Sequence, residues 1–127
     1  MILLDTNILI DYFRDKQPAK LFIETQDKEN LAICSVVAME PYRGSLNKAE
    51  FEYIKKTLKG FLMFDLNENV SQVALKLSER YAVSHNMAVA DTLIAATALV
   101  FGLEIKTYNL KDFQFIPTLE VSNKFDL

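Results

Sequence analysis

Residues 1–13 read MILLDTNILIDYF, and this stretch sets the fold that we expect for the whole chain. Its apolar run Ile2–Leu4 is short and continuous, which is typical of a strand buried on both faces of a sheet. Thr6–Phe13 then reads as a helix whose apolar face packs against that sheet. Asp5 stands at the junction of the two elements. A strand followed by a helix is the repeating unit of α/β proteins.

The rest of the chain continues this alternation of strands and helices. Further strands are predicted at Leu31–Cys34, Phe61–Phe64 and Leu103–Lys106, with a weaker one near Thr118–Val121. Helices are predicted from Pro18 to about Lys28, from a cap at Ser35, from Asn47 to near Gly60, from Asn67 through Tyr81, and from Met87 to Phe101 before a terminating Gly102. This order predicts a three-layer α/β/α fold with a central parallel sheet of four or five strands.

Length and composition indicate one domain over residues 1–127. With half of its residues hydrophobic, a chain of 127 residues should bury roughly two-thirds of its unfolded surface in a single core. Only three Gly and three Pro leave no obvious linker. The N-terminal apolar stretch is interrupted by Asp5 and Asn7, which argues against a signal peptide or membrane span and predicts a cytoplasmic protein.

The only cysteine, the only histidine and the net charge limit the functions that the sequence can support. Cys34 is the only cysteine, so it forms no intrachain disulfide and is interpreted as a buried strand thiol. His85, the only histidine, lies in a polar segment and is interpreted as an exposed loop residue. A net charge of −3 argues against nonspecific adhesion to nucleic acid, although a local basic rim remains compatible with it.

Acid and amide side chains occur where apolar runs meet polar segments or within an apolar helix. These residues are Asp5, Glu40, Asp91, Asn109 and Asp112. Because an α/β sheet brings the carboxyl ends of its strands to one edge, we expect these distant positions to meet there. A cluster of carboxylates suits a divalent cation, so the pattern indicates a metal site.

The helix around Asp91 is the most informative element. Residues 87–101 read MAVADTLIAATALVF, which is apolar on nearly every side, and Asp91 is their only charge. Burying an unpaired carboxylate costs several kcal/mol or forces its protonation, so Asp91 requires a metal, a cation or backbone donors. The alternative is an acid near a helix N-terminus that the helix dipole stabilises by roughly 0.3 to 1 kcal/mol.

Asp5 and Glu40 also have ordinary structural interpretations. Asp5 can cap the helix that follows it. Glu40 is an acid one turn into a helix, although it stands between apolar Met39 and Pro41 rather than on a charged face. The conjunction of the three acids, each expected after one of several adjacent strands, favours a shared site.

Four blocks of this sequence resemble, in order, the signatures of PIN-domain ribonucleases. The blocks are LLDTNILID at residues 3–11, SVVAME at 35–40, ADTLIAATA at 90–98 and KTYNLKDF at 106–113. The resemblance covers almost the whole chain, and within the family it is closest to the VapC class of toxins from type II toxin–antitoxin systems. Pro41 departs from the pattern, because the family usually carries Leu after its Glu.

The resemblance implies a magnesium- or manganese-dependent endoribonuclease whose acidic core and metal ligands are Asp5, Glu40 and Asp91. Magnesium prefers oxygen ligands, which agrees with this set. A metal held chiefly by Asp5 and Asp91 lowers the pKa of a bound water and neutralises charge on the phosphate. Glu40 is then expected to hold that water or accept its proton.

The remaining site residues are also implied by the resemblance. Asn109 matches the fourth catalytic position, which is Asp or Asn in the family, and Asp112 is a neighbour that can act through water. Thr6 and Asn7 directly follow Asp5 and are expected to orient its carboxylate rather than bind the metal. Whether Asn109 or Asp112 is the fourth site residue stays open in the sequence.

Basic residues follow several of the acid-bearing segments. Arg14, Lys16, Arg43 and Lys111 can surround the cleft and bind RNA, while acids elsewhere produce the negative total. Solvated surface charge is the equally ordinary alternative for each of them.

The resemblance implies three partners. They are an RNA substrate, such as tRNA or another structured RNA, a cognate VapB-type antitoxin, and a second copy of the chain. The homodimer would be favoured if four aromatic side chains lay on the surface, although a role in the core explains them equally well. These residues are Phe13, Phe22, Tyr53 and Phe61.

Other classes of protein share parts of the pattern. A non-catalytic RNA- or protein-binding module of the same fold could keep the acids. A phosphorylation-receiver domain fits Asp65 after the third strand but requires an acidic pair after the first. A haloacid-dehalogenase-type phosphatase requires an Asp at the position of Asn7.

Overall fold

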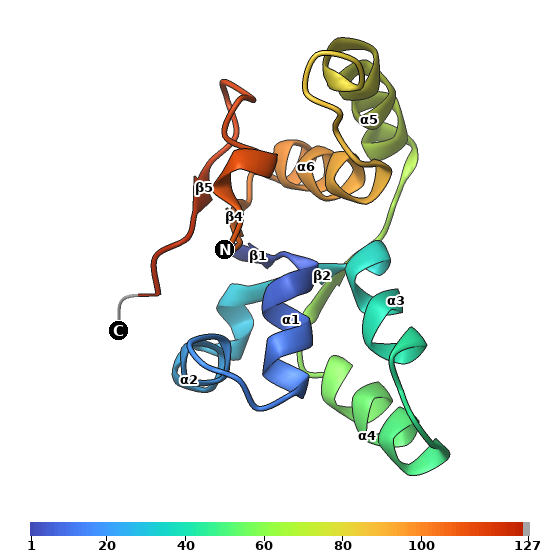
Figure 1. Ribbon diagram of the computed structural model, residues 1–127, viewed down its shortest axis with the longest axis vertical. Helices are drawn as coiled ribbons and strands as arrows, with labels where there is room; N and C mark the ends of the chain where they lie inside the picture. Colours follow the sequence, from blue (N-terminus) through green and yellow to red (C-terminus); the bar gives the residue numbers. More distant parts are fainter. Residues whose placement is uncertain (126–127) are drawn as a thin grey trace.

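A five-stranded parallel sheet forms the centre of the computed structural model, which describes residues 1–125 (Figure 1). The last two residues of the predicted domain lie outside this range. The strands are β1 (Ile2–Leu4), β2 (Leu31–Cys34), β3 (Leu62–Phe64), β4 (Glu104–Lys106) and β5 (Val121–Ser122). All four neighbouring pairs are parallel. The predicted parallel sheet is therefore confirmed.

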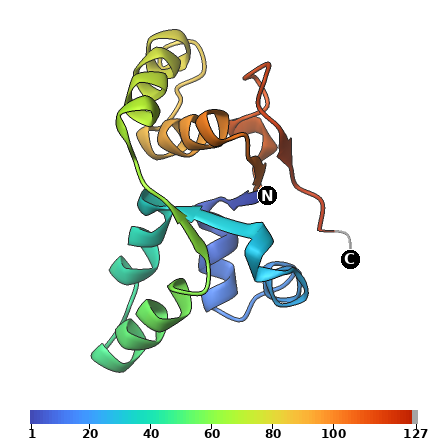
Figure 2. The same ribbon diagram turned by 180° about the vertical axis from the view of Figure 1, so that it is seen from behind.

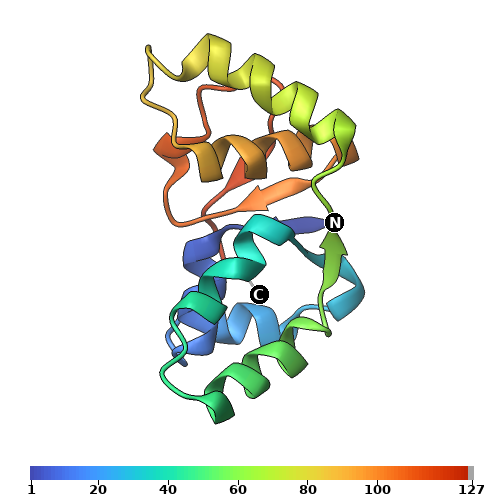
Figure 3. The same cartoon turned by 90° about the vertical axis from the view of Figure 1, so that its right-hand side faces the viewer.

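Helices cover both faces of this sheet. They are α1 (Thr6–Phe13), α2 (Ala19–Thr25), α3 (Ser35–Arg43), α4 (Lys48–Leu58), α5 (Glu68–Tyr81) and α6 (Val89–Phe101). Helices α1 to α4 lie on one side of the sheet, and α5 and α6 lie on the other (Figure 3). This arrangement confirms the predicted three-layer fold.

The strand order determines where a site can form. The order is β3-β2-β1-β4-β5, so the chain moves outward from β1 to β3 and then returns to β4 on the far side of β1. Because crossovers between parallel strands are right-handed, this reversal places α5 and α6 on the opposite face (Figure 2). Open α/β sheets bind ligands beside such a reversal, here between the ends of β1 and β4. Receiver domains have a different order, 2-1-3-4-5, which excludes that alternative.

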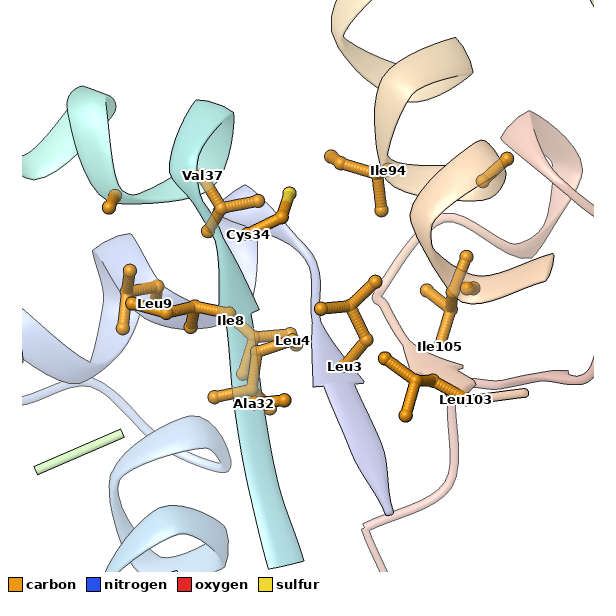
Figure 4. Packing of buried hydrophobic residues seen from close by; sticks show 14 of the residues in the cluster. Leu3, Leu4, Ile8, Leu9, Ala32, Cys34, Val37, Ile94, Leu103 and Ile105 are labelled. Atoms are coloured by element: carbon orange, nitrogen blue, oxygen red, sulfur yellow. The ribbon is translucent and has the colours of Figure 1, made fainter. Parts of the chain in front are cut away.

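The central strand β1 is buried on both faces, as its apolar run predicts. Leu3 points toward Ile94 of α6 and Ile105 of β4, whereas Leu4 points toward Ile8 of α1 (Figure 4). Both leucines have no exposed surface. Burial of each side chain stabilises the fold by roughly 1.5 to 3 kcal/mol, so β1 is held firmly between two helical layers.

Several helix ends follow the expected signals. Asn47 and Asn67 cap α4 and α5, and their side chains accept hydrogen bonds from the backbone N–H groups of Glu50 (2.8 Å) and Val70 (2.9 Å). Gly102 ends α6 in the left-handed conformation, with φ of 67°. These three ends confirm their predictions because local chemistry alone decides them.

Other boundaries were wrong. The helix predicted from Pro18 to Lys28 ends at Thr25, because Gln26 takes an extended backbone and Lys28 belongs to a separate 3-10 turn, η1 (Lys28–Asn30). Ser35 does not cap α3 but is its first residue, because β2 runs into the helix without a loop.

Two further elements begin later than expected. The helix predicted from Met87 starts at Val89, after Ala88 in an extended conformation. The weak last strand lies at Val121–Ser122 rather than Thr118–Val121, since Val121 pairs with Ile105.

The aromatic residues expected to favour a homodimer differ in exposure. Phe22 is 3% exposed and belongs to the core, so it offers no surface to a partner. Phe13 is half-buried and packs edge-on against Tyr53, which is 59% exposed. The homodimer therefore stays a prediction.

Cys34 is buried and His85 is exposed, which confirms both interpretations. His85 follows α5 and stacks on Phe115 with ring centroids 4.1 Å apart. Within residues 1–125, no helix has the length and apolar character needed to cross a membrane.

Candidate functional site

A cavity of about 430 Å³ opens where β1 and β4 end, and most of the residues that line it are acidic or polar. Every catalytic and supporting residue predicted from the sequence contributes to its wall, namely Asp5, Thr6, Asn7, Glu40, Asp91, Asn109 and Asp112. The cavity lies at the reversal of the strand order, where α/β proteins bind ligands. Residues that are far apart in the sequence therefore meet at the expected edge of the sheet.

Asp5 combines a structural position with a place in the cavity. It caps α1, and its Oδ1 accepts a hydrogen bond of 2.7 Å from the backbone N–H of Thr6. Its Oδ2 accepts a second bond of 2.7 Å from the hydroxyl of Thr107. The cap interpretation is thus confirmed, and the same carboxylate also lines the cavity, where its role in a site stays a prediction.

Thr107 organises this part of the cavity, although sequence reasoning did not select it. The residue is fully buried, and its hydroxyl donates to Asp5. The same oxygen accepts the backbone N–H of Asn109 at 3.0 Å and the side-chain amide of Asn7 at 3.5 Å. The Thr107 hydroxyl is therefore hydrogen-bonded to three predicted site residues, namely Asp5, Asn7 and Asn109. A signal was present, since Thr107 follows β4 just as Asp5 follows β1.

The contacts of Thr107 also fix the orientation of the Asn7 amide. A hydroxyl has one proton, and that of Thr107 is donated to Asp5. Asn7 must therefore donate its Nδ2 to Thr107 rather than accept a bond from it. Its Oδ1 is buried and has no hydrogen-bond partner among residues 1–125. Asn7 thus lines the cavity through its residue surface, while this oxygen itself is covered by protein atoms.

Asp91 lies in the first turn of α6 and is half-buried. The pKa of Asp91 is raised from the ordinary value of 3.8 to about 6, chiefly by burial and in addition by the nearby charges of Asp5 and Asp112. A helix dipole acting alone would lower this pKa. Burial and repulsion therefore outweigh the dipole, which favours the site interpretation over the simple helix-end interpretation.

The pKa of Asp5 is raised as well. Burial is the largest cause, the hydrogen bonds from Thr107 and Thr6 oppose it, and the charge of Asp112 adds to it. Asp112 lies in the 3-10 turn η2 (Leu110–Asp112), directly after Asn109. It therefore acts on both buried carboxylates, whereas the amide of Asn109 carries no charge. The cavity concentrates negative charge that a cation would neutralise.

The three acids do not all follow strands, so that expectation was wrong. Asp5 follows β1, but Glu40 lies in the second turn of α3 and Asp91 lies at the start of α6. Glu40 is exposed, with Arg43 Nη1 3.9 Å from its Oε1. As the side chains of residues 1–125 stand, no three His, Cys, Asp or Glu residues are arranged to hold one metal ion.

The predicted basic rim is not part of the cavity wall. Arg14, Lys16, Arg43 and Lys111 are exposed, and none of them lines the cavity. Arg43 forms an ion pair with the lining residue Glu40, and Lys111 lies in the sequence between the lining residues Asn109 and Asp112. Their role in RNA binding stays a prediction.

We predict that Thr107→Val lowers the stability of the protein more than a similar substitution elsewhere in the core, although it preserves the shape of the side chain. Valine keeps the shape but leaves Asp5 Oδ2 and the N–H of Asn109 without their present partner, which should cost roughly 1 to 3 kcal/mol of stability. Thermal unfolding at pH 8 measures this loss. Thr97→Val is the matched control, because Thr97 is equally buried, its hydroxyl donates to Leu93 O within its own helix, and it does not line the cavity. Equal losses in the two variants would contradict a special role for Thr107.

Comparison with known proteins places this chain in a family. The PIN domain model matches residues 2–115. The chain is 31% identical over 121 residues to Ribonuclease VapC10 of Mycobacterium tuberculosis, covering 94% of this chain and 91% of that protein. Ribonuclease VapC19 of the same organism is 27% identical over 123 residues, covering 94% and 98%.

A solved structure shows the same similarity in three dimensions. A chain of a toxin–antitoxin complex from Klebsiella pneumoniae superposes with a TM-score of 0.82 and 28% identity, covering 100% of both chains. The matched region contains every residue of the cavity wall. This chain belongs to the PIN-domain family.

Proposed function

We propose that this protein is a metal-dependent endoribonuclease, the toxin of a toxin–antitoxin pair, which inhibits translation by cutting RNA in the cytoplasm. The observation that carries the proposal is the gathering of Asp5, Asp91 and Asp112 in one partly buried cavity, where the pKa values of Asp5 and Asp91 are raised. The ribonuclease activity named for VapC10 and VapC19 supports it.

The donor set fits a magnesium or manganese ion. The residues that line the cavity include the carboxylates of Asp5, Asp91 and Asp112 and the side-chain amide of Asn109. Magnesium typically takes one or two carboxylates and fills its other positions with water and substrate phosphate, so a cluster of three acids is not required. Asp5 and Asp91 would hold the ion directly. Glu40 would contact it through a water molecule. A bound ion would acidify the attacking water and neutralise phosphate charge.

Residues of the protein itself position the groups that take part in the reaction. Thr107 and Thr6 fix the two oxygens of Asp5, so this carboxylate keeps one direction in the cavity. Glu40 is exposed at the cavity and can take the proton of the attacking water. Water adds to the phosphorus, the bond to the leaving ribose oxygen breaks, and that oxygen is protonated.

The first prediction from this proposed function concerns the cleavage of RNA. Asp91→Asn should reduce RNA cleavage by orders of magnitude with magnesium or manganese present, because a neutral amide oxygen holds a divalent cation much more weakly than a charged carboxylate does. Asp65→Asn is the control, since Asp65 is exposed and lies outside the cavity. Gel assays of a mixed RNA substrate measure both variants. Cleavage by Asp91→Asn at the wild-type rate would contradict the proposal, and RNA binding without cleavage by wild type would support the non-catalytic module.

The second prediction concerns stability and pH. Because the folded-state pKa of Asp91 is about 6, above its ordinary value of 3.8, ionising Asp91 lowers stability as pH rises through about 6. In chelator at pH 8, Asp91→Asn should therefore melt higher than wild type, on the order of a few degrees. The difference should shrink toward pH 5, where wild type takes up the proton.

Added magnesium should stabilise wild type more than Asp91→Asn, because only wild type keeps the full ligand set. Thermal melts at pH 5 to 8, with chelator or magnesium, give both comparisons. An Asp91→Asn protein clearly less stable than wild type at pH 8 would show that Asp91 is a structural residue.

The third prediction concerns the partner. We expect a VapB-type antitoxin to occupy the acidic cavity and offer Arg or Lys to its carboxylates. Purification of the tagged chain from its source should recover a small protein that suppresses RNA cleavage. Its affinity should fall for a variant carrying both Asp5→Asn and Asp91→Asn, but not for Asp65→Asn. Recovery of the chain without such a partner would count against the toxin role.

A further inference from the structure

The ring of His85, the only histidine of the chain, is held in a defined position on the surface. The imidazole lies nearly parallel to the ring of Phe115, at 22° and with centroids 4.1 Å apart. Tyr81 packs against both rings, with centroids 5.4 Å from His85 and 4.9 Å from Phe115. The Ser84 hydroxyl is hydrogen-bonded to the imidazole Nδ1 at 2.8 Å. None of these contacts belongs to the mechanism above.

The other face of the imidazole is open to solvent. Because Tyr81 lies only 4.9 Å from Phe115, it lies on the same side of the imidazole as Phe115 rather than across from it. His85 is exposed, whereas Phe115 is half-buried and Tyr81 is buried. The exposed surface of His85 therefore includes the face that points away from Phe115. A planar group can stack on this face without first ordering the side chain.

The stacked rings lie close to the wall of the acidic cavity. His85 belongs to the loop between α5 and α6, and that loop leads into Ala90 and Asp91, which line the cavity. Phe115 lies three residues after Asp112, another lining residue. Figure 3 shows this loop and the start of α6 on the side of the molecule where β1 and β4 end. A strand of RNA that enters the cavity can therefore extend over His85.

A positive charge accompanies the stacked rings. Arg80 is an exposed residue in the last turn of α5, and its guanidinium lies 6.0 Å from the ring centroid of Tyr81. The ion pairs formed within residues 1–125 do not include Arg80. A guanidinium without a carboxylate partner suits a phosphate group. Proteins that bind single-stranded nucleic acid combine such a cation with an aromatic ring on which a base stacks.

We propose that His85 and Arg80 form a subsite for an unpaired nucleotide of the RNA substrate. The base stacks on the open face of His85, and a neighbouring phosphate binds Arg80. Every base has a flat face, so this contact holds the strand beside the cavity without reading its sequence. A local contact of this kind is needed because the protein as a whole is acidic, with a net charge of −3. The subsite rests on the proposed function, since it assumes an RNA substrate.

The test measures binding in chelator, without cleavage, to two fluorescent strands. One is a 6-nucleotide RNA of adenosines, and the other has the same sugar-phosphate backbone but carries no bases. His85→Ala should bind the intact strand roughly 5-fold or more weakly than wild type, the low end of the effect of one stacked base, and should bind the base-free strand equally well. His85→Phe should match wild type on both strands, because its ring also offers a flat face.

Two further variants separate stacking from charge and from changes in the loop. Arg80→Gln should weaken the binding of both strands alike and reduce the salt dependence of binding by about one phosphate contact. Val83→Ala is the matched control in the same loop, because Val83 is 99% exposed and should leave both affinities unchanged. The base-free strand serves as the internal reference, since a distorted loop would not distinguish the two strands.

Each outcome decides the proposal. Equal losses for both strands in His85→Ala, or reduced binding of the intact strand by His85→Phe, would overturn the subsite. Wild type that binds neither strand, or both alike, would overturn it too. Unchanged RNA binding by His85→Ala, together with weaker retention of a copurifying protein, would assign the open face to a protein contact instead. Base-dependent binding that is lost in His85→Ala, without RNA cleavage by wild type in magnesium, would leave the subsite standing and refute the proposed nuclease.

Discussion

The hydrogen bond between Thr107 and Asp5 is the contact on which this structure depends. It joins residues 102 positions apart in the sequence, and it lies directly beyond the paired ends of β1 and β4. The backbone supports the same junction, since the N–H of Asp5 donates to the carbonyl oxygen of Lys106 at 3.0 Å. A carboxylate with so little exposure would be unstable without donors, so the strand ends, the cap of α1 and the cavity are formed together.

The second constraint is the repulsion between the carboxylates of Asp5 and Asp91, which the fold brings close together. Helix α6 is anchored in the core by small buried residues, namely Ala95, Ala96 and Ala98, which allow it to lie close to its neighbours. This anchoring brings Asp91 near Asp5, although the charge of Asp5 raises the pKa of Asp91 and so disfavours its ionised form. The apolar contacts of the helix are many, whereas the repulsion involves few groups. The core can therefore hold a locally unfavourable arrangement, which is common where binding depends on concentrated charge.

Sequence reasoning succeeded where local patterns decide the structure. The apolar run before Asp5, the asparagine caps and Gly102 need no information from distant residues. It also selected side chains that share one cavity, although only Asp5 among the three acids directly follows a strand, and helices α3 and α6 bring Glu40 and Asp91 to the same place. It failed for Thr107, whose importance lies in contacts with Asp5 and Asn7 that no periodicity reveals. The end of α2 at Thr25 likewise depends on how the chain must turn into β2.

The segment from Lys106 to Asn109 shows why fold and site are hard to separate in this protein. Successive side chains of an extended chain point in opposite directions, so neighbouring residues contact different parts of the molecule. Lys106 bonds Ser122 and Lys124 of the C-terminal segment, whereas Thr107 bonds Asp5. Tyr108 then packs on the same C-terminal segment and also lines the cavity. A change that loosens the last strand would therefore move the cavity wall as well, because both sets of contacts belong to one short stretch of backbone.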